Sequence, residues 1–197
     1  HRTRSLPDDR QEQQDQKIIL AVQQWVNDFV VDLNLCPFAK RELVKQRVRF
    51  VVSYADNEEA LLVALQAELN QLADNSDIET TLLIHPLMLN DFDAYNQFLD
   101  YADGLLKEMQ LDGVFQVASF HPNYQFGGTD IDDAENYTNR SPYPLLHILR
   151  EASLDAVLET TEHTDQIPVR NIALMNEMGA ARLKQMLSAC LDNSSES

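Results

Sequence analysis

The stretch TTLLIH at residues 80–85 decides the predicted fold. It is a short apolar run between polar residues, as expected of a strand that is buried on both faces of a sheet. Two similar runs flank it, RFVVSY at 49–54 and VFQVASF at 114–120. The intervening segments carry apolar residues three and four positions apart, which predicts helices over about 57–72 and 91–109.

The resulting order is strand, helix, strand, helix, strand. Each connection is long enough for a right-handed crossover, so we expect the strands to be parallel. Pro142 or Pro144 is predicted to start another helix that ends near Leu158, and Pro168 to start the last one. The expected fold class is α/β: a small, mostly parallel sheet of three to four strands that is covered by helices, with a helical C-terminal part.

We expect a single domain over residues 15–191, which opens with an amphipathic helix over 15–34. Residues 1–14 are charged and have no apolar centre, so we expect a disordered or appended segment there rather than a secretory signal. The tail at 192–197 is expected to be frayed. No apolar run approaches the roughly 20 residues that span a bilayer.

The formal net charge of −17 at pH 7 is strongly negative. Such a charge opposes binding to nucleic acid and to anionic membranes, so we expect neither as a partner. A cluster of lysines and arginines, here called the basic patch, is nevertheless suited to a small anion. The alternative is that these side chains form a solvated surface. The basic patch consists of Lys40, Arg41, Lys45, Arg47 and Arg49.

The two cysteines, Cys36 and Cys190, are too distant in sequence to indicate a disulfide scaffold, which favours a reducing, cytoplasmic location. Cys36 precedes Pro37, which is predicted to open a short helix over 37–45. A helix N-terminus and nearby cations favour the reactive thiolate, so Cys36 is a candidate nucleophile. The alternative is a small residue buried in the core. Cys190, late in the last predicted helix, is expected to be inert.

A long loop with histidine, glycine and aromatic residues follows the third predicted strand, within the stretch 120–151, and is typical of a functional site. Ligands of open α/β sheets bind beyond the carboxyl ends of the strands. His85 and His121 each end a predicted strand, and the loop leaves from the same edge. If the helix over 37–45 packs antiparallel to the first strand, Cys36 also lies at this edge.

Three residues are the candidate catalytic groups: Cys36, His121 and His147. The cysteine would be the nucleophile, and either histidine the general acid or base. The alternative is that the histidines only brace the loop through hydrogen bonds to the backbone. Cys36 with two histidines also resembles a zinc ligand set, but no HExxH or CxxC motif is present, so we expect no metal and assign no cofactor.

His147, Arg150 and Glu151 are spaced three and four apart, which puts them on one face of the predicted helix. We expect Arg140 and Arg150 to hold a carboxylate or a phosphate through paired hydrogen bonds. The alternative is a salt-bridged surface. The further binding residues expected in the same stretch are Tyr124, Asn139 and Glu151.

Several of these motifs together resemble the bacterial family known as domain of unknown function 1415. They are NLCPFA at 34–39, FHP at 120–122 followed by Tyr124 and Phe126, NRSPYP at 139–144 followed by His147, Leu149, Arg150 and Glu151, and finally Pro168, Arg170 and Asn171. The resemblance spans roughly residues 15–190. It implies a bacterial, cytoplasmic, single-domain protein and supplies neither an activity nor catalytic residues.

Two hypotheses about function follow. In the first, the protein is an enzyme that hydrolyses or transfers a group of a small anionic substrate, with Cys36 as nucleophile and His121 or His147 as acid or base. In the second, it is a non-catalytic small-ligand sensor or protein-binding adaptor that uses the 120–151 loop and its aromatic side chains for recognition. The sequence leaves both hypotheses open, together with the oligomeric state.

Overall fold

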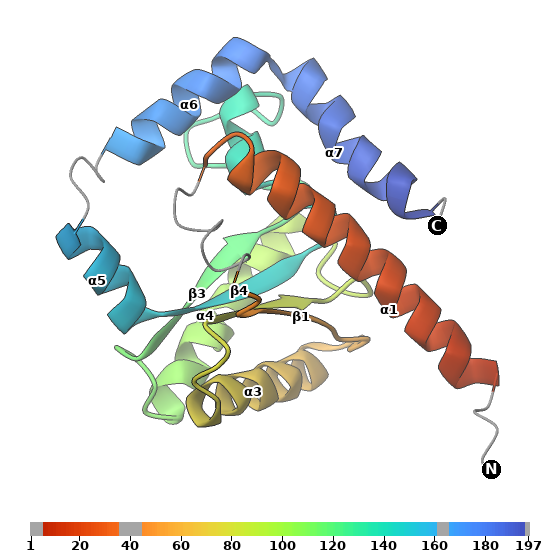
Figure 1. The fold of residues 1–197 in the computed structure, drawn as a ribbon, viewed down its shortest axis with the longest axis vertical. Helices are drawn as coiled ribbons and strands as arrows, with labels where there is room; N and C mark the ends of the chain where they lie inside the picture. Colours follow the sequence, from red (N-terminus) through yellow and green to blue (C-terminus); the bar gives the residue numbers. More distant parts are fainter. Residues whose placement is uncertain (1–5, 36–44, 161–165, 196–197) are drawn as a thin grey trace.

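The structure is a computed structural model that describes residues 6–35, 45–160 and 166–195 (Figure 1). After two helical elements, strands and helices alternate as far as the fourth strand, and the elements described after it are helices. In chain order the elements are α1 (Leu6–Trp25), η1 (Val26–Val31), β1 (Val48–Val52), α3 (Glu58–Asp74), β2 (Thr80–Ile84), α4 (Phe92–Glu108), β3 (Phe115–Phe120), η2 (Ala134–Asn139), β4 (Leu145–Arg150), α5 (Glu151–Thr160), α6 (Ile167–Met178) and α7 (Ala180–Ser195).

The strands form one open sheet in the spatial order β1-β2-β4-β3. β1 and β2 are parallel, with Val48 opposite Thr80. β4 lies between β2 and β3 and is antiparallel to both. The prediction of an α/β fold is confirmed. The prediction of a mostly parallel sheet is wrong, because β4 forms an antiparallel pair on each side.

The error concerns the helix predicted from Pro142 or Pro144 to Leu158, which is strand β4 followed by α5. The run LLHILR at 145–150 has apolar residues at spacings that fit a helix and also fit a strand buried on both faces. As an inner strand, β4 satisfies its backbone groups by pairing with a neighbour on each side. Its conformation is therefore decided by strands that are distant in sequence.

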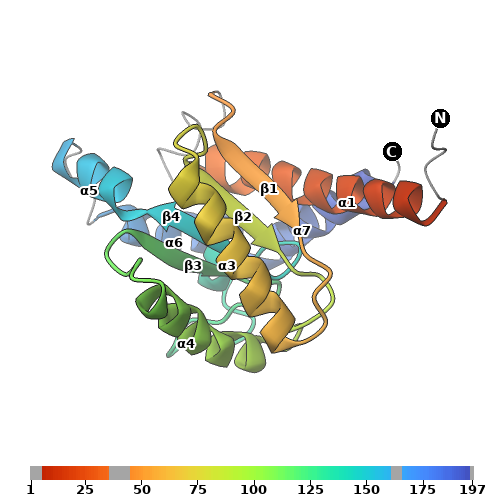
Figure 2. The same ribbon diagram turned by 90° about the horizontal axis from the view of Figure 1, so that it is seen from below.

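Helices cover both faces of the sheet (Figure 2). α3 and α4 pack on one face, whereas α1, η2, α6 and α7 gather on the other. The sheet separates two apolar cores, and alternate residues of β2 enter each of them. Leu82 and Ile84 face α1, and Leu83 faces α3 and α4, as the two-residue period of a strand requires.

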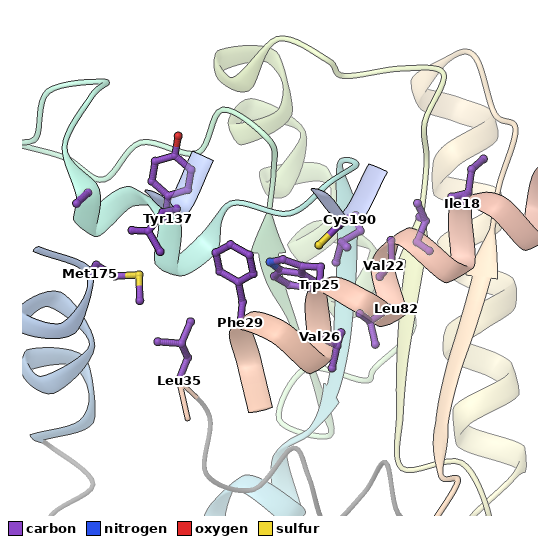
Figure 3. Close-up of a cluster of buried hydrophobic side chains, with 14 residues drawn as sticks. Ile18, Val22, Trp25, Val26, Phe29, Leu35, Leu82, Tyr137, Met175 and Cys190 are labelled. Atoms are coloured by element: carbon purple, nitrogen blue, oxygen red, sulfur yellow. The ribbon is translucent and has the colours of Figure 1, made fainter. Parts of the chain in front are cut away.

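The core beneath α1 brings together side chains from elements that are far apart in the chain (Figure 3). Trp25 of α1 and Phe29 of η1 are fully buried, and the Trp25 ring meets Phe120 of β3 edge-on at a centroid distance of 5.2 Å. Met175 of α6 and Cys190 of α7 belong to the same core. The helical C-terminal part therefore packs against the N-terminal helix and the sheet.

Both ends of the chain carry more helix than predicted. α1 begins at Leu6, so residues 6–14, which were expected to be disordered or appended, are helical. α7 continues to Ser195, into the tail that was expected to fray. Most of the predicted helix over 37–45 lies outside the described residues. None of the helices described is long and apolar enough to cross a membrane.

The two helices on the opposite face of the sheet begin at residues whose side chains cap them. The Asn57 side chain accepts a hydrogen bond from Ala60 N at 2.9 Å, and the Asp91 side chain accepts one from Ala94 N at 3.1 Å. Each bond satisfies a backbone N–H group that has no partner within the first turn of the helix. Both predicted helices are confirmed as α3 and α4.

Tyr95 joins α4 to the ends of β3 and β4. Its buried hydroxyl donates to Leu145 O at 2.6 Å and accepts from Phe120 N at 3.0 Å. We predict that Tyr95→Phe lowers the free energy of unfolding, measured in urea, by about 1–3 kcal/mol, because two buried backbone groups lose their partner. Tyr101→Phe on the exposed side of α4 is the control, with an expected change below about 0.5 kcal/mol. Equal losses in both variants would contradict this role of Tyr95.

Candidate functional site

His85 and His121 lie at one edge of the sheet. β2 and β3 run in the same direction because each is antiparallel to β4, so their carboxyl ends share that edge. His85 directly follows β2 and His121 directly follows β3, and both side chains are 0% exposed. The Tyr95 ring lies beside both, with its centroid 5.9 Å from that of His85 and 4.9 Å from that of His121.

Both ring nitrogens of His121 form hydrogen bonds with backbone groups. Its Nε2 donates to Leu89 O at 2.8 Å, and its Nδ1 accepts from Asn123 N at 3.0 Å. Leu89 has a φ of 59°, a left-handed conformation that leucine rarely adopts, and the histidine holds its carbonyl group. Burial lowers the pKa of His121, so the ring is neutral at pH 7. These bonds are those expected of a residue that braces the loop.

His85 is enclosed in a similar way. Its Nδ1 donates to Met88 O at 3.3 Å, and its buried Nε2 has no hydrogen-bond partner among the described residues. Burial is the main cause that lowers the pKa of His85 to about 4. A charged imidazole is costly in such surroundings, so His85 is also neutral at pH 7.

Aromatic rings fill the space around the two histidines. The Phe92 ring is 5.5 Å from that of His121 and 4.9 Å from that of Tyr124, and Tyr124 meets Phe126 at 5.0 Å. Aromatic pairs at these distances are attractive. Together with His85 and Tyr95 these residues form a packed ring cluster, which encloses the histidines rather than presenting them to a substrate.

Arg140 holds the loop between β3 and β4 from within. It is 7% exposed, and it donates from Nε to Tyr124 O at 3.0 Å and from Nη2 to Ile131 O at 2.6 Å. Its guanidinium lies 4.7 Å from the centroid of the Tyr137 ring, which adds a cation–π attraction. Arg140 was predicted to bind an anion, but these two N–H groups donate to carbonyl groups of the loop.

Two asparagines complete this bracing. The buried Asn136 accepts at Oδ1 from Phe126 N at 2.9 Å and donates from Nδ2 to Asp130 O at 2.8 Å. Asn139 donates from Nδ2 to Ser119 O at 3.0 Å, at the end of β3. The loop is therefore a compact element that is packed by its own side chains.

Arg150 and Glu151 lie at the opposite end of the sheet. Leu145 pairs with Phe120, the residue before His121. Arg150 is five residues further along β4, and five residues of strand span about 17 Å. The Arg150 guanidinium donates to carbonyl groups at the end of α3 and in the turn after it. These carbonyls belong to Leu72, Asn75 and Ile78.

Two predictions about these residues are therefore wrong. Arg140 and Arg150 do not form one clamp, because they lie at opposite ends of the sheet and bond to different parts of the backbone. His147 and Arg150 do not share a helix face with Glu151, because both belong to strand β4. On a strand, residues three apart point to opposite faces.

His147 lies near the middle of β4, on the face of the sheet that α1 covers. Its direct neighbours on the adjacent strands are Leu82 and Ala118, and the Phe120 ring is 6.0 Å from its own. Its Nε2 is 2.8 Å from Thr80 Oγ1. Its Nδ1 makes no hydrogen bond within the part of the chain that the structure describes, and the residue as a whole is partly exposed. Burial lowers the pKa of His147 to about 4, so the ring is neutral at pH 7.

The described part of the basic patch is largely paired. Arg47 forms a salt bridge with Glu79 at 3.0 Å. Arg49 donates two hydrogen bonds to the Glu68 carboxylate, at 2.8 and 3.3 Å. Lys45 is exposed. Most of the positive charge that the structure describes in this patch is thus balanced by acidic side chains.

Three candidate residues lie outside the described residues: Cys36, Lys40 and Arg41. The chain just before them is tied to α6, where Asn171 donates from Nδ2 to Leu35 O at 3.0 Å and Arg170 donates to Asn34 O. These bonds connect two of the motifs that carry the family resemblance.

Cys190 is a free, fully buried thiol in the core beneath α1. Burial raises the pKa of this thiol to about 11, which disfavours the reactive thiolate and agrees with the expected inert role. Among the described residues, no three His, Cys, Asp or Glu side chains are placed to hold a metal ion together.

The fold and this geometry define a small α/β protein with a partly exposed histidine on an apolar sheet face. Residues 17–185 match the model of a family described as protein of unknown function (DUF1415), and the chain belongs to that family. The resemblance stated from the motifs is thereby confirmed. No curated protein and no solved structure matches the chain.

Thr80 and Tyr95 contact the candidate histidines but were not predicted as site residues. The sequence offered one signal, shared by Thr80 and Thr81, since these two threonines begin an otherwise apolar strand. A buried polar group of this kind needs a hydrogen-bond partner. Tyr95 lies among the apolar positions of the predicted helix and so resembles an ordinary core residue.

The lowered pKa of His85 predicts that acid destabilises the fold. The unfolded histidine binds a proton near pH 6.5, whereas the folded one binds it only near pH 4, so stability falls as the pH drops between these values. From about pH 7 to about pH 5, His85 is expected to account for a loss of about 2 kcal/mol. Urea unfolding at both pH values should show a correspondingly smaller loss in His85→Gln, and an unchanged loss would contradict the prediction.

Proposed function

We propose that the protein is an enzyme that hydrolyses, or transfers a group from, a small anionic ester, with His147 as its general base. The observation that carries the proposal is the difference between the three described histidines. His85 and His121 are enclosed in the ring cluster, whereas His147 is partly exposed and keeps Nδ1 without a hydrogen bond to a described residue. The neutral ring keeps a lone pair on Nδ1, which can take the proton of a hydrogen-bonded nucleophile during the reaction.

The nucleophile in this proposal is Cys36, as inferred from its place in the sequence. Its thiol proton would pass to Nδ1 of His147, and the thiolate would displace the alcohol of the ester. The imidazolium would return the proton to the leaving oxygen, and water would then release the group bound to sulfur. His121 is not assigned this role, because its hydrogen bonds to Leu89 and Asn123 occupy both nitrogens.

Apolar neighbours suggest what kind of substrate this site would take. Leu82, Ala118 and Phe120 surround His147 on the sheet, and such walls suit an apolar part of the ester. The anionic part would be bound by Lys45, the exposed residue in the described part of the basic patch, and not by Arg140 or Arg150. We place this activity in the cytoplasm, in keeping with the free thiol of Cys190.

We predict that Cys36 reacts with iodoacetamide at about pH 7 at least about tenfold faster than Cys190, and that His147→Gln slows the alkylation of Cys36. A base that shares the thiol proton raises the thiolate fraction, so loss of the base slows alkylation. Mass spectrometry of the two cysteine peptides measures both rates in one sample, with Cys190 as the internal control.

The same variant tests catalysis directly. The substrates are a panel of chromogenic esters, both short-chain acyl esters and phosphate esters. For any ester that the native protein cleaves, His147→Gln should lower kcat/KM by about 100-fold or more, the usual contribution of a general base. Equal alkylation of Cys36 in the native protein and in the variant, together with no cleavage of the panel, would overturn the proposal.

One observation favours the second hypothesis, a protein-binding adaptor. The self-packed loop between β3 and β4 exposes the apolar Ile131, with 58% of its surface accessible, between the exposed Asp130 and Asp132. A rigid loop that displays an apolar side chain within a negative border is suited to a partner with a complementary basic border.

The adaptor hypothesis predicts that Ile131→Ser removes a stoichiometric partner that copurifies with the native protein. Val63→Ser, on the outer side of α3, is the matched control because Val63 is similarly exposed, at 60%. Affinity purification followed by quantitative mass spectrometry should show a loss of about tenfold or more in the loop variant alone. Equal recovery from both variants would exclude this surface as the binding site.

A further inference from the structure

We propose that Thr80 is a positioning residue for His147: it holds the imidazole proton on Nε2 and thereby keeps Nδ1 free as the basic nitrogen. This inference rests on the proposed role of His147 as general base. Thr80 is the first residue of β2, and 67 positions separate it from His147 in the chain. Strand pairing between β2 and β4 brings the two side chains together.

The position of the proton follows from two distances. Thr80 Oγ1 lies 2.5 Å from Ile148 O, a separation that two oxygen atoms tolerate only when a hydrogen atom lies between them. The carbonyl has no hydrogen to give, so the threonine hydroxyl donates. Having used its single hydrogen there, Oγ1 can only accept at its 2.8 Å contact with His147 Nε2. Nε2 therefore carries the imidazole proton, and Nδ1 has a free lone pair.

The surroundings keep this arrangement rigid. Thr80 is 8% exposed, and its branched side chain has few rotamers. Its acceptor, the carbonyl of Ile148, belongs to the residue that follows His147 on β4, so donor and acceptor are held by the same pair of strands. Without the hydroxyl, an N–H group at Nε2 would be left without this partner in an apolar place, so the preference for the proton on Nε2 would be lost.

Thr81 provides a matched control at the next position of the same strand. It is also buried, but it faces the α3 side of the sheet, and its hydroxyl has no hydrogen-bond partner among the described residues. Thr81→Val therefore removes a buried threonine hydroxyl from β2 without touching His147. Thr80→Val makes the same change in size and chemistry beside the ring, and Thr80→Ser retains the hydroxyl.

We predict that ¹⁵N NMR of the imidazoles shows His147 of the native protein as the Nε2–H tautomer at about pH 7. Thr80→Val should shift the ratio of Nε2–H to Nδ1–H by at least about tenfold towards Nδ1–H. Thr80→Ser and Thr81→Val should keep the native ratio. Assignment of the His147 signals comes from the spectrum of His147→Gln.

Two results would overturn the inference. The first is the finding that His147 of the native protein carries its proton on Nδ1. This measurement needs no Thr80 variant, so it does not depend on whether such a variant folds. The second is a folded Thr80→Val whose tautomer ratio equals that of Thr81→Val. Neither readout depends on activity. If Thr80→Val shifts the tautomer ratio as predicted but His147→Gln changes neither the alkylation of Cys36 nor ester cleavage, the proposed function is rejected and the inference about Thr80 stands.

Discussion

The antiparallel insertion of β4 between β2 and β3 is the constraint on which the rest of the structure depends. It gives β2 and β3 the same direction without making them neighbours, so His85 and His121 come to one edge with a strand between them. It also carries Arg150 to the other end of the sheet and places His147 in the middle of one face. A parallel β4, or a helix in its place, would change the position of each of these groups relative to the others.

Most buried polar side chains near the sheet edge have backbone groups as partners. His121 bonds to Leu89 and Asn123, and Arg140 bonds to Tyr124 and Ile131. Unpaired polar groups in such places are costly, so these side chains stabilise a loop that has little regular structure of its own. Residue types that often serve catalysis support the loop here, and their hydrogen bonds to the backbone distinguish His121 and Arg140 from His147.

His147 differs because its environment is asymmetric. One nitrogen lies within the sheet against a hydroxyl, and the other makes no hydrogen bond within the described part of the chain. Apolar neighbours disfavour the charged ring, so the ring is neutral at pH 7 and its unbonded nitrogen keeps a lone pair. This combination of a held and a free nitrogen suits acid–base chemistry better than the fully paired ring of His121 does.

The sequence by itself determined the elements whose signals are local. Helices α3 and α4 start at Asn57 and Asp91, whose side chains cap them, and β1, β2 and β3 are short apolar runs between polar segments. Only the tertiary structure decided β4, because the apolar spacing of LLHILR fits a helix and a buried strand equally well. It alone also supplied the partners of His147 and Arg150, since these lie 67 to 78 positions away, where no local pattern reaches.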